Sequence, residues 1–195
     1  MKSLKGTKTA ENLIHSFAGE CQARTRYTYY SSIAKKEGYI QISNIFMETA
    51  EQEKEHAKKF YKFLKDDFTD EAIEITASFP VSFHEDTVLN LKAAAAGENE
   101  EWTDLYPKFA KIAREEGFEV IAISYEKILE VEKRHEDRYI KLAKNIEDNS
   151  VFKKEESVLW KCLNCGYIYE GAEAPITCPA CAHPQGYFEL FVEAY

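Results

Sequence analysis

Glu53-Lys54-Glu55-His56 and Glu132-Lys133-Arg134-His135 are the two stretches that decide the fold of this chain. Each contains a Glu followed three residues later by a His, which places both side chains on one face of a helix. A Gly-Glu pair precedes each stretch, so that Glu20 lies 33 residues before the first and Glu98 lies 34 residues before the second. The same arrangement of acidic and imidazole side chains therefore occurs twice, in register.

Two glycines, Gly38 and Gly117, fall at matching places in these halves and predict the ends of long helices. Because Gly and Pro are otherwise scarce there, we expect four helices, over residues 9–37, 40–66, 86–116 and 118–147. Residues 67–85 then form a long crossover between two helical hairpins. Pro107 lies inside the third helix and predicts a kink or a break there.

Two Glu/His pairs, with one Glu from each of two further helices, form the ligand set of a di-iron carboxylate bundle. The candidate ligands are Glu20, Glu53, His56, Glu98, Glu132 and His135. Burying four carboxylates together is costly unless cations are present, so we expect two divalent cations, bridged by Glu53 and Glu132. Mixed carboxylate and imidazole ligands suit iron or manganese better than zinc, and we predict iron. The alternative, two amphipathic hairpins without a metal, does not account for landmarks that repeat in register.

The second half carries one additional acid, Glu101, three residues after Glu98, where the first half has Ala23 after Glu20. Glu101 makes the two metal positions inequivalent if it is a ligand; otherwise it is an outer or solvated acid in a polar segment. Tyr27 shares the helix face of Glu20 and is a further candidate near the site. A core tyrosine bonded to a backbone group fits Tyr27 nearly as well, and the same applies to Tyr106.

Cys162-Leu163-Asn164-Cys165 and Cys178-Pro179-Ala180-Cys181 form a second metal signature, with twelve residues between the two pairs. Four thiolates at this spacing form a tetrahedral site for zinc or a single iron, and the spacing does not choose between them. Disulfides fit less well, because close pairs around turn residues are typical of a metal knuckle. We expect short strands and turns around a small aromatic core of Trp160, Tyr167, Tyr169, Phe188 and Phe191.

Composition excludes several classes of function. The net charge of −9 over 195 residues argues against a nucleic-acid surface, which needs a basic stripe. The chain contains no apolar run long enough to span a bilayer, and its start has no apolar signal core. Cysteines kept as thiolates indicate a reducing compartment, so we expect the cytoplasm.

With both metal signatures in this order, the chain resembles the rubrerythrin family over essentially all of its 195 residues. The resemblance implies a mainly α fold: a ferritin-like four-helix bundle over residues 1–148, a linker over 149–157 and a small C-terminal rubredoxin-like four-cysteine metal domain over 158–195. It implies three irons per chain, with zinc as a possible substitute. Two are held by the bundle ligands with Glu101, and one by Cys162, Cys165, Cys178 and Cys181. The tail departs from free rubredoxins, because Ala182 replaces the expected glycine and the cysteine pairs are closer together.

The resemblance also implies an activity, the reduction of hydrogen peroxide to water in protection against oxidative stress. In this family one iron moves between a Glu and a His ligand with redox state, and by position these are Glu101 and His56. The family's tyrosine close to the di-iron centre matches Tyr27, so the expected catalytic residues are Tyr27, Glu101 and His56. The electrons come ultimately from NAD(P)H, through a separate reductase or a rubredoxin, and pass through the chain's own four-cysteine iron.

Two rival functions are an iron-oxidising bundle of the ferritin type, which uses O2, and a non-enzymatic bundle carrying a zinc ribbon. The four cysteines argue against the first, and the seven bundle ligands argue against the second. We also expect at least a homodimer with electrons crossing between chains. The last helix would extend roughly 20 Å beyond its ligands at about 1.5 Å per residue, which takes the tail away from its own di-iron site. A tail folded back on its own bundle is the alternative.

Overall fold

The first hairpin consists of two long helices whose ends are fixed by local chemistry. The computed structural model describes residues 2–194. Helix α1 (Lys8–Lys36) begins where the side chain of Thr7 accepts a hydrogen bond from the backbone N–H of Ala10. It ends before Gly38, whose φ of 85° is a left-handed conformation that favours glycine. Helix α2 (Ile40–Leu64) follows at once and packs along α1.

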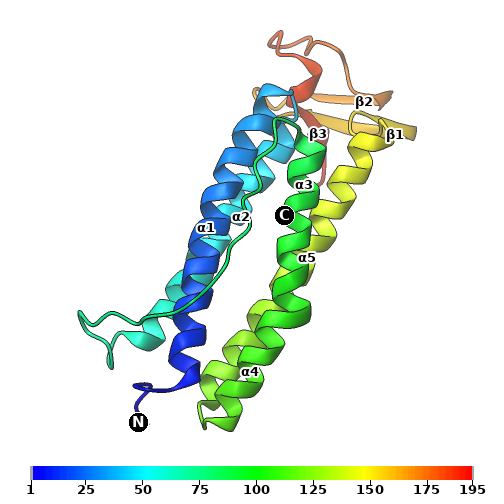
Figure 1. Cartoon of the computed structure of the whole chain (residues 1–195). Coiled ribbons are helices and arrows are strands. Elements are labelled where there is room, and N and C mark those ends of the chain that lie inside the picture. The colour runs from blue at the N-terminus through cyan, green and yellow to red at the C-terminus, as the bar shows by residue number, and fades with distance from the viewer. Residues whose placement is uncertain (1, 195) are drawn as a thin grey trace.

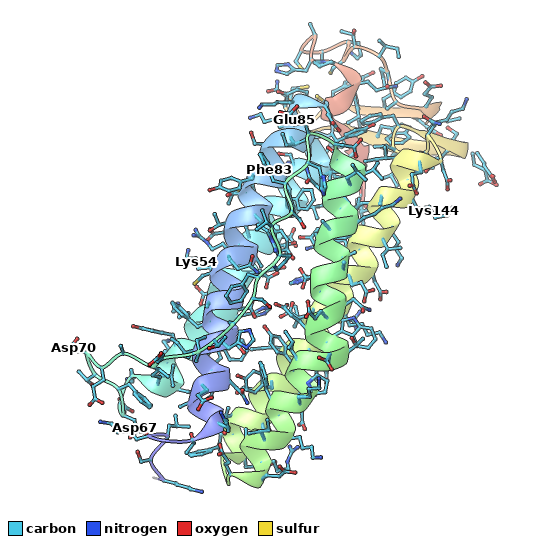
Figure 2. All side chains as sticks on the ribbon, in the orientation of Figure 1. Lys54, Asp67, Asp70, Phe83, Glu85 and Lys144 are labelled. Carbon is cyan, nitrogen blue, oxygen red and sulfur yellow. The ribbon has the colours of Figure 1, made fainter. Side chains whose placement is uncertain are left out.

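A long crossover joins the two hairpins, as predicted. Between Lys65 and Asp86 the chain contains no helix or strand. Figure 2 places Asp67 and Asp70 near one end of the bundle and Phe83 and Glu85 near the other, so the crossover runs along the whole bundle.

The third helix of the bundle is interrupted, and the interruption is a wide helical turn. Helix α3 (Thr87–Glu100) continues into a π-helix, η1 (Glu101–Leu105), and then into α4 (Tyr106–Glu115). The backbone N–H of Tyr106 donates to the carbonyl of Glu101, five residues back. Pro107, which follows directly, has no N–H to donate, so the predicted break lies just before it. The last helix, α5 (Glu119–Glu147), then packs against α3 and α4 (Figure 1).

The π-helix explains why the two halves of the sequence differ by one residue. Glu98 lies 78 residues after Glu20, whereas Tyr106 lies 79 residues after Tyr27, and Gly117 lies 79 residues after Gly38. The extra residue of the second half therefore falls between Glu98 and Tyr106, where the helix widens to take it in. The repeat keeps its spatial register in spite of the insertion.

The bundle core has two apolar clusters with acidic residues between them. One cluster contains Leu13, Phe60, Tyr106 and Tyr125, and the other contains Tyr27, Phe46, Leu91 and Tyr139, all essentially inaccessible to solvent. On α1, Glu20 lies between Leu13 of the first cluster and Tyr27 of the second. The apolar clusters thus close off the acidic layer at both ends and lower its local dielectric.

The C-terminal region is a small three-stranded antiparallel sheet. Its strands are β1 (Lys153–Cys162), β2 (Ile168–Glu173) and β3 (Phe188–Leu190), in the order β2-β1-β3, with a short 3-10 helix η2 (Gln185–Tyr187) before β3. Trp160 is fully buried at its centre and donates its Nε1–H to the carbonyl of Gly171 at 2.9 Å.

Two expectations for this region were wrong in detail. Residues 153–157 were assigned to the linker, but β1 begins at Lys153, which pairs with Glu173. Residues 154–157 continue this strand as an irregularity between the paired residues Lys153 and Val158, and their polar side chains are mostly exposed. Tyr167, assigned to the small core, is exposed, and Phe191 is only partly buried outside the cluster that Trp160 centres.

The sheet docks on the end of its own bundle, at the turn between α1 and α2 (Figure 1). A Cβ added to Gly186 would lie 2.1 Å from the carbonyl oxygen of Gly38, so the two backbones touch directly. The rings of Tyr39 and Phe152 stack beside this contact, with centroids 6.2 Å apart. Among residues 2–194, no helix is long and apolar enough to cross a membrane.

Candidate metal centres

Six of the predicted ligands meet in the middle of the bundle. Glu20 comes from α1, Glu98 from α3, and the two Glu/His pairs from α2 and α5. Their ligand atoms form two groups, each within 4.8 Å: Glu20, Glu53, His56 and Glu132 in one, and Glu53, Glu98, Glu132 and His135 in the other. All four carboxylates are buried.

Two of the carboxylates face both groups. Glu53 places one oxygen 2.8 Å from Nδ1 of His56 and the other 3.1 Å from Nδ1 of His135. The two oxygens of Glu132 each lie 2.9 Å from the same two nitrogens. Each of these carboxylates thus offers one oxygen to each group, which is the geometry that bridging ligands require.

The unpaired atoms of this layer fit a pair of cations. Six buried atoms have no hydrogen-bond partner within residues 2–194: Oε2 of Glu20, Oε1 of Glu53, Oε2 of Glu98, both carboxylate oxygens of Glu132, and Nδ1 of His135. Buried polar atoms are normally paired, because leaving one without a partner costs about 1–3 kcal/mol. They converge within each group and carry lone pairs, so divalent cations would satisfy them.

Two tyrosines hold the outer oxygens of the end carboxylates. The hydroxyl of Tyr27 donates to Oε1 of Glu98, and that of Tyr106 donates to Oε1 of Glu20, both at 2.5 Å. Each tyrosine therefore binds a candidate ligand from the other hairpin, not a backbone group. Tyr106 lies eight residues after Glu98, whereas Tyr27 lies seven residues after Glu20, because η1 contains the extra residue of the second half. For this reason the sequence did not show that the two tyrosines occupy equivalent positions.

The two histidines are held differently. Nε2 of His135 lies 2.9 Å from Oε1 of Gln52, an acceptor that keeps the proton on Nε2 and leaves the lone pair of Nδ1 for a cation. The hydrogen bonds within residues 2–194 include none to Nε2 of His56, whose side chain is 14% exposed. Within residues 2–194, His135 is therefore held through both ring nitrogens, whereas His56 is held through Nδ1 alone, by Glu53 and Glu132. Sequence reasoning missed Gln52, for which the only signal was its place next to Glu53.

Glu101 lies beside the site but in neither ligand group. It is the first residue of η1 and is partly buried, with Oε1 3.9 Å from the position that a Cβ on Gly19 would take. Burial, followed by the negative charge of Glu98, raises the pKa of its carboxyl well above the usual range. The structure therefore places Glu101 at the edge of the acidic layer, on the side of Glu20.

Side chains from α5 hold the π-helix in place. Glu136, the neighbour of His135, accepts hydrogen bonds from the indole of Trp102 and from the amide of Asn99, the latter at 3.0 Å. The ammonium group of Lys133 lies 5.1 Å from the centroid of the Trp102 ring. These contacts fix the turn from which Glu101 projects.

The four predicted cysteines also come together, at one end of the sheet. Sγ of Cys162 lies 3.7 Å from that of Cys181, and Sγ of Cys165 lies 3.7 Å from that of Cys178. Sulfurs about 2.3 Å from one tetrahedral ion stand about 3.8 Å apart, far beyond the length of a disulfide. The set therefore fits a single cation. Cys165 is the exposed member, whereas Cys162 and Cys178 are buried.

The two cysteine turns have the same backbone although one lacks its glycine. Gly166 and Ala182 follow the two pairs with φ of 77° and 59°, and each N–H donates to the carbonyl of the first cysteine of its pair. The left-handed conformation of Ala182 lowers the free energy of unfolding by about 1–2 kcal/mol, and the free energy of metal binding offsets this cost.

Comparison with known proteins agrees with both sites. A family model described as Rubrerythrin matches residues 11–143, and one described as the rubredoxin-like domain of rubrerythrin matches residues 160–189. The chain belongs to the rubrerythrin family. It therefore has the mainly α fold expected of that family, a ferritin-like bundle followed by a rubredoxin-like domain, and its metal centres are a di-iron carboxylate site and a four-cysteine iron site.

The rubrerythrin relatives extend over the whole chain. A rubrerythrin of Clostridium perfringens is 67% identical over 195 residues and covers 100% of both proteins. A rubrerythrin of Nitratidesulfovibrio vulgaris is 52% identical over 190 residues, which is 97% of each protein. A solved structure of nigerythrin in its fully reduced, all-ferrous state matches with a TM-score of 0.63 and 29% identity, covering 97% of this chain and 92% of that one.

Without cations, protons balance the buried charge of the di-iron ligands. Burial and the charge of Glu53 raise the pKa of Glu98 to about 8. Burial opposes ionisation of Glu53 as well, but the two imidazoles outweigh it and lower the pKa of that carboxyl to about 2. Burial disfavours protonated imidazole, yet contacts with Glu132 and Glu53 raise the pKa of His56 to about 10 and that of His135 to about 12.

Filling the bundle site should therefore release protons. At neutral pH we expect at least two protons per chain, one from each imidazole, because metal ligands bind in their deprotonated forms. Anaerobic titration with Fe²⁺ in a weakly buffered indicator dye measures the release. The Cys162→Ser, Cys165→Ser double variant removes the contribution of the cysteine site. Release of less than one proton per chain from that variant would contradict the assignment.

Proposed function

We propose that this chain reduces hydrogen peroxide to two molecules of water, with electrons relayed through its own four-cysteine site, and so protects the cell against oxidative stress. The observation that carries the proposal is the presence in one chain of a two-metal carboxylate site and a tetrathiolate site. Peroxide reduction takes two electrons and two protons, and a reduced iron pair would supply both electrons in one encounter. A tetrathiolate iron carries one electron at a time and suits the role of relay.

Side chains around the site are suited to hold the two protons. Burial, and then the charge of Glu98, raises the pKa of the Tyr27 hydroxyl well above its usual range, so it stays protonated. Glu101 keeps its proton for the reasons given above and lies at the outer edge of the layer. We assign Glu101 and Tyr27 as proton donors to the peroxide oxygens.

Glu101 and His56 are proposed as alternative ligands of one metal position. His56 belongs to the ligand group that contains Glu20, and Glu101 lies on the same side of the layer. The charge of Glu101 is the largest contribution, after burial, to the raised pKa of Glu20. The absence of an anchor on Nε2 of His56 within residues 2–194 allows its ring to withdraw.

Electrons are proposed to cross between two copies of the chain. Gly38, against which the C-terminal domain docks, follows the end of α1 and lies 18 residues after Glu20, about 27 Å at about 1.5 Å per residue. In Figure 1 the strands β1, β2 and β3 lie at the end of the bundle, next to the turn between α1 and α2. A head-to-tail homodimer would bring each four-cysteine site close to the partner's di-iron site. The external electron donor is either an NAD(P)H-dependent reductase or a rubredoxin. The protein acts in the cytoplasm, where cysteine thiolates stay reduced.

The function is tested by the choice of oxidant. Chemically reduced protein, mixed in a stopped-flow instrument with equal concentrations of peroxide or O2, should be oxidised by peroxide at least tenfold faster. The additional carboxylate Glu101 is the feature that separates this site from an iron-oxidising bundle. Equal rates for the two oxidants would favour the ferritin-type alternative.

Replacing Glu101 by alanine should impair chemistry more than folding. Loss of an acid from an anionic layer relieves repulsion, so we expect the thermal unfolding temperature of the metal-free protein to be unchanged or raised. The rate of oxidation by peroxide should fall on the order of 100-fold, as for loss of a general acid. Asp104→Ala, which removes an exposed acid from the same π-helix, is the matched control. An unchanged oxidation rate with full iron content would show that Glu101 takes no part in the reaction with peroxide.

A further inference from the structure

A cavity leads from the surface to the Glu20 side of the acidic layer. It has a volume of about 180 Å³ and lies between α1, the crossover and the junction of α3 with η1. Its walls include His15, Gly19, Arg26, Phe79, Glu101 and Tyr106. Two of these residues belong to the site itself, because Tyr106 donates to Glu20 and Glu101 borders the ligands. A small molecule in this cavity is therefore in contact with the site.

The outer wall of the cavity is the crossover. The ring of Phe79 meets the imidazole of His15 edge-on, with centroids 5.7 Å apart. Just beyond Phe79 the crossover is fastened to α1, where Arg26 donates to the carbonyl of Pro80 at 3.2 Å and Tyr30 donates to that of Ser82 at 2.6 Å. The hydrogen bonds of the described chain include none to residues 72–79. Phe79 thus ends a segment that only side-chain packing holds against the bundle.

The inner end of the cavity is open because residue 19 has no side chain. A Cβ on Gly19 would lie 3.8 Å from the Phe79 ring and 3.9 Å from Oε1 of Glu101. The aromatic ring and the carboxylate therefore flank one small space over α1, which is open only because residue 19 is glycine. The backbone of Gly19 is ordinary helix, so the glycine is not needed for its conformation.

We propose that this cavity is the passage by which peroxide reaches the metal site, and that Phe79 restricts it to hydrogen peroxide. The inference rests on the proposed function. The space between Phe79 and Glu101 suits a molecule not much larger than water, whose share of liquid volume is about 30 Å³. A tert-butyl or aryl group would have to displace the ring. The polar side chains of the wall, such as Arg26 and Gln22, offer hydrogen bonds to a peroxide.

Two variants change the passage in opposite directions. Phe79→Ala removes the ring and should raise the rate with tert-butyl hydroperoxide, relative to that with hydrogen peroxide, at least tenfold. Gly19→Ala places a methyl group in the opening at ordinary contact distance and should lower the rate with hydrogen peroxide at least threefold. Alanine is the better helix former, so Gly19→Ala should not unfold the protein. Val81→Ala changes a fully exposed residue of the same crossover and should leave both rates unchanged.

Azide binding to the oxidised, iron-loaded protein gives a readout other than turnover. Absorbance stopped-flow should show azide associating at least threefold more slowly with Gly19→Ala than with the unaltered chain, at the same Kd, because a passage changes rates and not equilibria. A changed Kd with an unchanged association rate would overturn the proposal, as would unaltered peroxide selectivity in Phe79→Ala. If the unaltered protein does not reduce peroxide, the proposed function fails, and the azide rates still decide whether the passage exists.

Discussion

Replacing Cys162 and Cys165 together by serine should lower donor-driven peroxide turnover by a factor on the order of 100 or more, because removal of two of four thiolates abolishes the metal site. Electrons would then have no relay into the bundle. The same variant, reduced chemically, should still react once with peroxide, since its di-iron ligands lie in another part of the molecule. Steady-state consumption of peroxide and a single-turnover stopped-flow experiment measure the two quantities. Turnover at the unaltered rate would show that electrons bypass the cysteine site.

The same variant tests transfer between chains. It is refolded together with a chain carrying Glu53→Ala and Glu132→Ala, which lacks both carboxylates shared by the two ligand groups. Neither homodimer should turn over peroxide with a donor. Heterodimers combine one intact four-cysteine site with one intact di-iron site on opposite chains, and should recover turnover if electrons cross. Proven heterodimers without recovery would place the transfer within one chain.

Replacing Glu132 by alanine should have a larger effect than replacing a bundle residue that belongs to one ligand group. Its two oxygens each lie 2.9 Å from a different imidazole, so the change removes a ligand from both metal positions. We expect fewer than two bundle irons per chain and a loss of peroxide reactivity on the order of 100-fold or more, because metal binding depends on the full ligand set. The helices should persist, since the two apolar clusters on either side of the acidic layer are unchanged.

Iron content per chain and single-turnover oxidation by peroxide test this expectation. Glu130→Ala is the matched control: Glu130 is also on α5, but it is exposed and pairs with Lys127 at the surface. Retention of two tightly held bundle irons in Glu132→Ala would show that Glu132 is not a bridging ligand.

Much of the bundle could be predicted from the chain alone. Helix periodicity puts a Glu and a His three residues apart on one face, so each Glu/His pair could be predicted from a short stretch of sequence. The in-register repeat then supplied the partner helices, because two equal hairpins bury their polar stripes against each other. The helix ends at Gly38 and Gly117 followed from a left-handed conformation that glycine favours, and both glycines have φ above 80°.

Elements that depend on contacts between distant residues were less predictable. The polar composition of residues 153–157 suggested a linker, but Lys153 pairs with Glu173 of β2, and residues 154–157 continue the strand to the next paired residue, Val158. Pro107 indicated a break in the third helix but not that the break is a π-helix. The π-helix accommodates the extra residue while the residues on either side keep their positions against α5, and this depends on packing between helices. Gln52 had no pattern to distinguish it from an exposed amide.

The sequence by itself indicated the six candidate ligands that cluster in the bundle, the long helices that carry them and the position of the cysteine knuckle, because these depend on spacing within a helix or a turn. Only the tertiary structure decided that Glu101 stands outside both ligand groups and that Tyr27 and Tyr106 each hold a carboxylate from the other hairpin. It also decided that Phe79 closes a cavity beside Gly19. These features join residues far apart in the chain, and their distances are set by how the helices and the crossover pack, which no local spacing encodes.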